Sequence, residues 1–535
     1  MSNKKSFLRG AAILGVAGII VKILGAVYRI PLGNILQPEG MGYYQASYPI
    51  YTMLFALSTA GLPVAVAKII AEKRALGDYK SADRVFKLSF IGLCAMGLIT
   101  GIIILAFGKQ IVGWLGTPRA YYSLIALFPA LLFVPMMAAF RGYFQGQQNM
   151  VPTALSQIFE QTFRIILGLY LAKAFIGIGL DKAAGGAAFG ASAGAVAGFL
   201  VIFFIYLYNR GALRAEIKAQ TFESNESTGE LIKKIILIAL PITLGAMIVP
   251  IMNTFDLKIV MGRLASIGYS YDDANEMWGK MSGYAQTFIN FPQVISIGLA
   301  MSLVPAISEA FAVKDHEKMK NLTNTGIRTI VLIGMPSTIG LAVLATPIID
   351  LLYFKLEVGV RQSIGSILAA LAISVIFLTL VQALTAILQG IGKATIPVIN
   401  LIIGAGVKIV ISYILVGNPA FHIYGAVIST IVAYVIAAVL NFIAVLKYTG
   451  VTIDYVSAFI KPTIASFIMG AVAWGVNFGL GKVISPKLST IVAIGLAAGV
   501  YGILIFALKI ITKEELLTMP KGKKIVRLLE KFRLC

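Results

Sequence analysis

Basic side chains lie inside several long apolar stretches of this sequence, where a charge is costly. Arg164 and Lys408 each follow a short polar hinge, at residues 144–152 and 388–397, and the two cations are 244 positions apart. A charge at the middle of a membrane span costs about 2.5–3.5 kcal/mol and usually faces an interior cavity. The pattern therefore predicts a cavity lined by cations. Its natural ligand is an anion such as phosphate, which Arg and Lys bind through charge-assisted hydrogen bonds.

Three further cations fit the same predicted cavity. Arg29 and Lys258 form a second related pair, and Lys22 adds a charge to the first apolar stretch. Simpler explanations stay open. Glu160 stands four residues before Arg164 and could neutralise it on one helix face, whereas Arg29 and Lys258 could reach out to the membrane interface. The predicted substrate-binding residues are Lys22, Arg29, Arg164, Lys258 and Lys408, with Glu160 in a supporting role.

Little else in the chain could carry catalysis or hold a metal. The two cysteines, Cys94 and Cys535, and the two histidines, His316 and His422, provide neither a disulfide framework nor a metal site. Asp256 lies inside an apolar stretch and is either an ion-coupling carboxylate or the partner of a nearby cation. We predict no catalytic residue, no metal centre and no cofactor, and the chain is not expected to be an enzyme.

The elements that position these residues follow from composition. The 535 residues are 58% hydrophobic and only 13% charged, with a mean hydropathy of +0.88, which excludes a set of soluble domains. A helix needs about 20 mostly apolar residues to span a bilayer, and such runs recur along nearly the whole chain. We expect an all-α polytopic membrane protein with fourteen spans, near residues 7–35, 44–70, 88–107, 121–140, 152–175, 185–208, 231–261, 282–311, 327–352, 364–388, 396–416, 423–446, 455–480 and 488–511.

The related hinges and cations divide the chain into two parallel repeats of six spans each. Two C-terminal spans have no counterpart in the first half. The expected parts are a first lobe, a cytoplasmic linker, a second lobe, a lipid-facing pair of helices and a basic amphipathic tail for an anionic membrane surface. They cover residues 1–208, 209–231, 232–448, 449–512 and 513–535 respectively.

The net charge of +22 is explained by membrane topology. With a cytoplasmic N-terminus, the cytoplasmic segments hold about two thirds of the 45 Lys and Arg residues, which agrees with the positive-inside rule and puts both termini in the cytoplasm. Nucleic-acid binding would need basic clusters with interleaved aromatic residues on a soluble surface, and the sequence has none. We expect a monomer in a bacterial plasma membrane, surrounded by membrane lipids.

Several short motifs occur in a consistent order along the first twelve predicted spans. They are Lys22-Ile23-Leu24-Gly25, Tyr28-Arg29-Ile30-Pro31-Leu32, Arg141-Gly142-Tyr143-Phe144-Gln145-Gly146, Glu160-Gln161 with Arg164, Asn253-Thr254, Tyr284-Ala285 before Phe291-Pro292, Gly298-Leu299-Ala300 before Val304-Pro305, and Lys408. In this order the motifs resemble the multidrug/oligosaccharidyl-lipid/polysaccharide exporter superfamily. More closely, they resemble its branch that contains the lipid II flippase MurJ and the stage V sporulation protein B group.

The resemblance implies two six-helix lobes in a V-shaped bundle, plus two helices that form a lipid-facing groove. Members are thought to move a lipid-linked precursor outward by alternating access, with the polyprenyl tail beside the last two spans. Their cavity arginines on the first span match Lys22 and, with a one-residue shift, Arg29. Thr287, to which we also assign a supporting role, stands where an arginine is expected, so we infer that Arg164 and Lys408 take over part of that role.

Ion coupling in the family suggests one more set of residues. Some relatives hold a sodium ion between the seventh, eleventh and twelfth spans, where Asp256, Asn400 and Thr430 are the side chains available here. Protons or the membrane potential could supply the energy instead, because an inside-negative field pushes an anionic headgroup outward.

The sequence thus predicts a flippase for an undecaprenyl-diphosphate-linked cell-wall precursor, with lipid II as the first candidate. Another lipid-linked oligosaccharide, or cation-coupled drug export, is the runner-up within the superfamily. A basic cavity argues against cationic drugs. A membrane enzyme acting on polyprenyl-linked sugars is the alternative from another class. It would need carboxylates or His on a sizeable loop outside the bilayer, and the loop around Asp272 is short.

Overall fold

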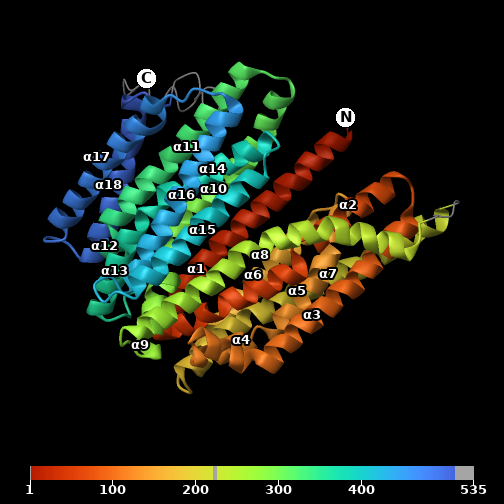
Figure 1. Cartoon of the computed structure of the whole chain (residues 1–535), viewed down its shortest axis with the longest axis horizontal. Helices are drawn as coiled ribbons and strands as arrows, with labels where there is room; N and C mark the ends of the chain where they lie inside the picture. The colour runs from red at the N-terminus through yellow and green to blue at the C-terminus, as the bar shows by residue number, and fades with distance from the viewer. Residues whose placement is uncertain (1, 221–225, 512–535) are drawn as a thin grey trace. The chain divides into compact units, whose positions relative to one another are not determined.

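The computed structural model describes residues 2–220 and 226–511, with the side chains of residues 2–12, 212 and 213 left out, and this part of the chain is helical without strands. The predicted basic tail at 513–535 therefore lies outside the described residues. By contact, the chain divides into two compact units, Met1–Gly279 and Lys280–Cys535. The all-α architecture expected from the sequence is confirmed (Figure 1).

The first unit holds the residues predicted from the first hinge. Its helices are α1 (Ser2–Thr59), α2 (Leu62–Ala75), α3 (Tyr79–Leu115), the 3₁₀ turn η1 (Pro118–Ala120), α4 (Tyr121–Ile125), α5 (Phe128–Gly146), α6 (Val151–Phe175), α7 (Leu180–Ala219), α8 (Thr228–Ser266) and α9 (Tyr271–Trp278). The seventh predicted span, α8, packs with this unit: the Gly61 N–H between α1 and α2 donates to the Thr243 hydroxyl at 3.1 Å. The predicted division into lobes concerns the sequence repeat, and it stays a prediction.

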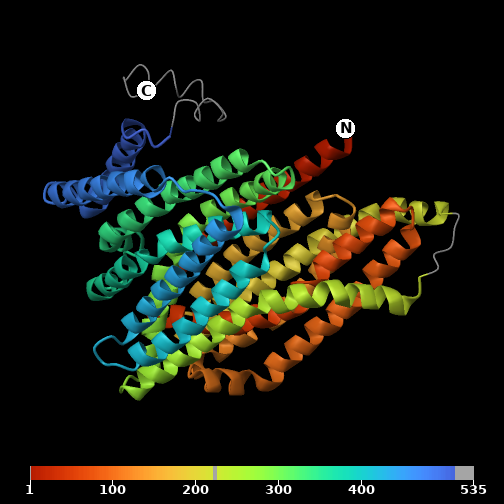
Figure 2. The same ribbon diagram turned by 45° about the horizontal axis from the view of Figure 1, so that its top comes forward.

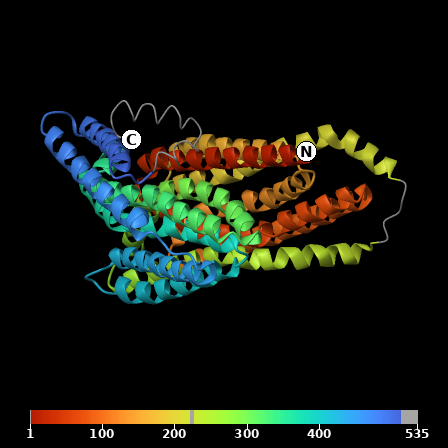
Figure 3. The same cartoon turned by 90° about the horizontal axis from the view of Figure 1, so that it is seen from above.

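The second unit contains the second hinge and the two unmatched spans. After the π-helical turn η2 (Gly279–Ala285) come α10 (Gln286–Ala312), α11 (His316–Val343), α12 (Ala345–Leu352), α13 (Val358–Ala372), α14 (Ser374–Gly390), α15 (Thr395–Val416), α16 (Ile423–Thr449), η3 (Val456–Ile460), α17 (Lys461–Leu480) and α18 (Pro486–Ala507). α15 and α16 run side by side (Figure 3). α17 and α18 form a pair at the edge of this unit, beside α11 and α12 (Figure 2).

The helices account for the predicted spans with two adjustments. Eleven helical stretches of the described residues are long and apolar enough to cross a membrane, or twelve when the bent pair α13 and α14 counts as one. One of them, Ile13–Ala75, covers two predicted spans. The turn expected between these two spans is a kink inside α1 at Gln37, the residue before Pro38, whose ring and missing N–H disrupt the helix. α6 is not among the eleven because its middle is polar, which is the feature that matters for the site.

The connection from α7 to α8 is fastened to the turn between α2 and α3. Arg74 makes two hydrogen bonds to the Glu216 carboxylate, at 2.8 and 3.0 Å. The buried Lys73 pairs with Glu226 at 2.9 Å, and Lys234 pairs with the same carboxylate at 2.6 Å. Some of the basic residues next to the predicted cytoplasmic face are therefore used to hold the linker, and not only to contact lipid headgroups.

Candidate functional site

A strip of glycines on α7 holds α6 unusually close. Gly186, Gly190, Gly194 and Gly198, here called the glycine strip, recur every four residues and so share one helix face. A Cβ at each position would collide with the α6 backbone: at Gly194 it would lie 2.3 Å from the Glu160 carbonyl oxygen, and at Gly190 2.6 Å from that of Arg164. Small residues allow such backbone contact between membrane helices. α6 is thereby held against α7, and its long polar side chains contact groups of the other neighbouring helices, α1 and α5.

Arg164 points from the middle of α6 to aromatic residues of α1. It lies 13 residues after Val151, about 20 Å along the helix. Its guanidinium donates to the Tyr44 hydroxyl at 3.3 Å and stands 5.4 Å from the centre of the Tyr48 ring. Across the described ranges 2–220 and 226–511, no carboxylate lies within ion-pair distance of it. Arg164 is thus a half-buried cation whose contacts are with neutral groups.

Glu160 is occupied by a different arginine. The Arg141 Nη2 on α5 lies 2.8 Å from a Glu160 carboxylate oxygen, and the Arg141 Nε donates to the Ser156 hydroxyl at 2.9 Å. Both acceptors are on α6, one turn apart. The simpler explanation of Arg164, neutralisation by Glu160 four residues earlier, is therefore wrong for this structure, because Arg141 takes the carboxylate.

The predicted cations on α1 lie in the same unit. The Tyr28 hydroxyl donates to the Ala187 carbonyl of α7 at 3.3 Å and is close enough to Arg29, Arg164 and Tyr44 to interact with them electrostatically. Arg29 is partly buried, and Lys22, two turns earlier, is exposed. Arg29 and Arg164 are thus brought near one tyrosine, although they are 135 positions apart in the sequence.

Lys258 has a different environment. It donates to the carbonyl of Trp114, in the last turn of α3, and its ammonium lies 5.3 Å from the centre of the Trp114 ring. The C-terminus of a helix attracts cations, and Trp is typical of the membrane interface. This position agrees with the alternative in which Lys258 extends to the interface. The nearby Asp256 is buried, with 5% of its surface exposed.

In the second unit, Lys408 is partly buried on α15. Thr287, where an arginine was expected, is buried and donates to the Gly283 carbonyl of the preceding turn, in η2, at 2.8 Å. Asn400 donates to the Asn441 amide oxygen on α16 at 2.8 Å, and Thr430 donates to the Ala426 carbonyl at 2.8 Å. Asn441 and Thr430 are 11 residues apart on one helix, about 16 Å. The structure does not bring the predicted sodium ligands Asn400 and Thr430 together.

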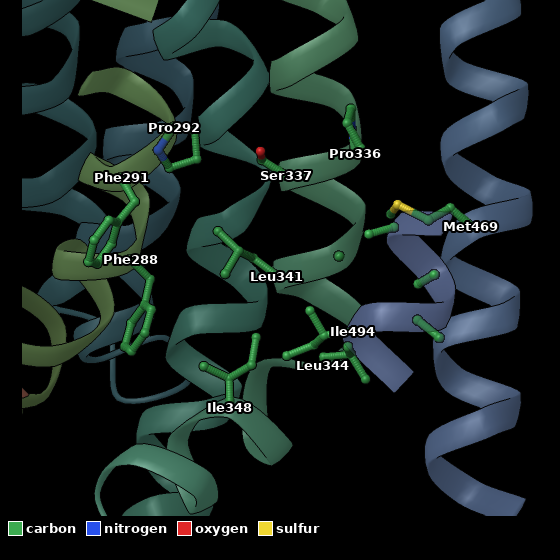
Figure 4. A pocket seen from close by; sticks show the side chains of 14 residues that line it. Phe288, Phe291, Pro292, Pro336, Ser337, Leu341, Leu344, Ile348, Met469 and Ile494 are labelled. Atoms are coloured by element: carbon green, nitrogen blue, oxygen red, sulfur yellow. The ribbon is translucent and has the colours of Figure 1, made fainter. Parts of the chain in front are cut away.

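An apolar cavity of about 720 Å³ lies within the second unit (Figure 4). Side chains from α10, α11, α12, α17 and α18 line it. Among the lining residues only Ser337 has a polar side chain, and its hydroxyl donates to the Ile333 carbonyl of its own helix at 2.7 Å. The surface offers nothing to a polar ligand, so a hydrocarbon chain is the chemistry that it suits.

Sequence reasoning missed three residues of this site. Two of them, Tyr44 and Tyr48 on α1, hold Arg164. The third, Arg141, enters the sequence analysis only within the Arg141–Gly146 motif, which does not indicate its pairing with Glu160. The available signal was the excess of polar residues at the centre of α6, which required partners on the helices packed against it.

Comparisons with known proteins agree with this architecture. Residues 7–311 match the family model described as polysaccharide biosynthesis protein, and residues 282–414 match the MatE model. Stage V sporulation protein B of Bacillus subtilis (strain 168) is 29% identical, with 98% of this chain and 100% of that protein covered. Lipid II flippase MurJ of the same strain is 27% identical, with 94% of each covered. A solved structure of lipid II flippase MurJ in an inward closed conformation aligns with a TM-score of 0.65 at 17% identity, over 91% of this chain and 97% of that one.

Proposed function

Because the chain belongs to the polysaccharide biosynthesis protein family, in the branch of the multidrug/oligosaccharidyl-lipid/polysaccharide exporter superfamily that contains MurJ and stage V sporulation protein B, we propose that it moves an undecaprenyl-diphosphate-linked cell-wall precursor across the plasma membrane. Lipid II is the proposed substrate. The relatives of this chain are transporters and not enzymes, and the chain is a multi-pass membrane protein. In the proposed orientation both termini are cytoplasmic, and the protein acts as a monomer.

The observation that carries this proposal is the state of Arg164. Arg164 is a cation in mid-helix, and its contacts among the described residues, the Tyr44 hydroxyl and the Tyr48 ring, are neutral. It therefore has charge and donors left for an anion. A diphosphate offers several oxygens that can accept charge-assisted hydrogen bonds, which are stronger than those to a neutral hydroxyl. In the proposed binding step the phosphate oxygens replace Tyr44 as acceptors. We also propose that Lys408, at the related position of the second half, binds substrate.

The apolar cavity beside α17 and α18 supports the same substrate class. Its lining of Phe, Leu, Ile, Met and Ala side chains suits part of a polyprenyl tail. In this proposal the tail remains in hydrocarbon while the diphosphate and sugars cross a polar path. Cationic drug export, which the MatE match could suggest, would require acidic side chains in place of Arg164.

For the driving force we propose the membrane potential. The potential contributes about 2.3 kcal/mol per elementary charge per 100 mV, and an anionic headgroup moving outward follows an inside-negative field. Asn400 and Thr430, the predicted sodium ligands, lie apart, which argues against sodium coupling and so supports this choice. Dissipating the potential with an ionophore, at constant sodium and pH, should slow translocation. Full activity without a potential would contradict the choice.

Complementation tests the proposal. A bacterial strain depleted of its lipid II flippase would receive the wild type, the double variant Arg164→Ala/Lys408→Ala, or Lys87→Ala, at matched membrane levels. Lys87 is an exposed residue that pairs with Asp83 one turn earlier on α3, so its loss should be harmless. Growth with the wild type and with Lys87→Ala, but not with the double variant, is the expected result. Growth with the double variant would show that neither Arg164 nor Lys408 is needed for substrate binding. No rescue by the wild type would indicate a different substrate.

A further inference from the structure

Arg141 stands outside the cations that the sequence assigned to the substrate, yet it controls the charge around them. We infer that Arg141 is a positioning residue: by holding Glu160, it prevents this carboxylate from neutralising Arg164. The inference rests on the proposed function, because it names the residue that keeps the proposed anion site positive.

Glu160 and Arg164 would ordinarily pair with each other. They are four residues apart on α6, with the acid on the N-terminal side, which is the favourable order for an ion pair within a helix. The Glu160 side chain is 27% exposed, and such an attraction is stronger at a part-buried position than at an exposed surface. Something must therefore compete for Glu160, and the competitor is the guanidinium of Arg141 on the neighbouring helix.

Arg141 is well held for this task. Its Nε binds the Ser156 hydroxyl while its Nη2 binds Glu160, so two of its donors engage successive turns of α6. Ser156 is fully buried, and its own hydroxyl donates to the Thr153 carbonyl, which fixes it as an acceptor. The Arg141 side chain is only 16% exposed. This fixed, two-point contact favours Arg141 over Arg164, because less side-chain freedom remains to be lost.

The charges of the three residues give an ordered expectation. In the wild type, the charges of Arg141, Arg164 and Glu160 sum to one positive charge. Arg141→Ala leaves none, and it frees Glu160 to pair with Arg164. Glu160→Gln leaves two positive charges, and the double variant Arg141→Ala/Glu160→Gln returns to one. Affinity for a diphosphate should therefore fall in the order Glu160→Gln, then the wild type and the double variant together, then Arg141→Ala.

The experiment measures binding of undecaprenyl diphosphate to the full chain in nanodiscs, with undecaprenol as the probe that lacks phosphate. Arg141→Ala should bind the diphosphate roughly tenfold more weakly, as expected for loss of one hydrogen bond to a charged group. Adding Glu160→Gln should restore the wild-type affinity, and Glu160→Gln alone should exceed it. Undecaprenol binding should be the same in all four proteins. Lys87, whose side chain is 67% exposed, serves as the matched control, since Lys87→Ala should change nothing.

The outcomes separate this inference from the proposed function. If the wild type binds undecaprenyl diphosphate no better than undecaprenol, the proposed function fails and the inference fails with it. If the wild type prefers the diphosphate but the double variant is as weak as Arg141→Ala, Arg141 only supports the helix packing, and the inference alone is overturned. Should Arg141→Ala not fold, Glu160→Gln decides: tighter binding supports the inference, and equal or weaker binding refutes it.

Discussion

Replacing Gly194 by alanine should both destabilise the protein and displace Glu160 and Arg164. The added Cβ would lie 2.3 Å from the Glu160 carbonyl oxygen and 3.1 Å from the Arg164 Cβ. A carbon and a carbonyl oxygen ordinarily stay about 3.3 Å apart or more. The two helices must therefore separate by about 1 Å, on the face where α6 carries both Glu160 and Arg164. Overpacking of this kind typically costs about 1–3 kcal/mol.

Gly92→Ala provides the matched control for Gly194→Ala. Gly92 is also in the interior of a helix, α3, but an added Cβ there would meet nothing within 4 Å. At such a position alanine stabilises by about 0.4–1 kcal/mol, because it restricts the unfolded chain. The two changes are chemically identical, so the reasoning predicts opposite signs.

The assay is unfolding of the purified protein in detergent, followed by circular dichroism, together with binding of undecaprenyl diphosphate. Gly194→Ala should unfold more easily than the wild type and bind more weakly, whereas Gly92→Ala should do neither. If both variants shift stability in the same direction, the close approach of α6 and α7 does not limit this fold. A stable Gly194→Ala variant with normal binding would equally refute the argument.

Two further predictions follow from other parts of the molecule. Hydrogen bonds from Lys234 and Lys73 hold the pKa of Glu226 below its ordinary value. A carboxyl with a lowered pKa in the folded protein stabilises the fold at pH values above its ordinary pKa, and this stabilisation is lost as the pH falls through the pKa of the folded state. Acid titration of unfolding should therefore show less loss of stability below about pH 4.5 in Glu226→Gln than in the wild type, and identical curves would contradict the pairing. Ala498 lines the apolar cavity from an exposed position of α18, and its replacement by tryptophan should fill the cavity. Binding of undecaprenyl diphosphate should then weaken, whereas binding of a short-chain prenyl diphosphate should not. Equal loss of binding for both lipids would show that the cavity does not hold the tail.

Much of the architecture could be predicted from the sequence, for a local reason. Whether a segment enters the bilayer depends mainly on its own hydropathy, so the expected spans correspond to helices even where α1 passes through a kink at Gln37. The cost of a buried charge is also a property of the segment itself, and this cost identified Arg164 and Lys408 as residues to explain. Span boundaries were less well defined, because helices such as α3 and α7 extend beyond any apolar run.

The partners of those charges could not be predicted in the same way. The sequence left open three kinds of partner for Arg164: Glu160 on its own helix, the phosphate of a substrate, or groups on other helices. The nearest in sequence, Glu160, proved to be bound by Arg141. The spacing of Asn400 and Thr430 was equally compatible with a shared ion, yet each donates elsewhere.

The sequence by itself determined that this chain is a helical membrane protein with cations inside its spans, because hydrophobic burial and the cost of charge act on each segment separately. Only the tertiary structure decided that Arg164 meets Tyr44 and Tyr48 while Glu160 meets Arg141. These pairings depend on which helices pack against α6 and how closely, and the glycine strip of α7 sets that distance. A competition between charges on separate helices is settled by geometry in three dimensions, which spacing along one helix does not contain.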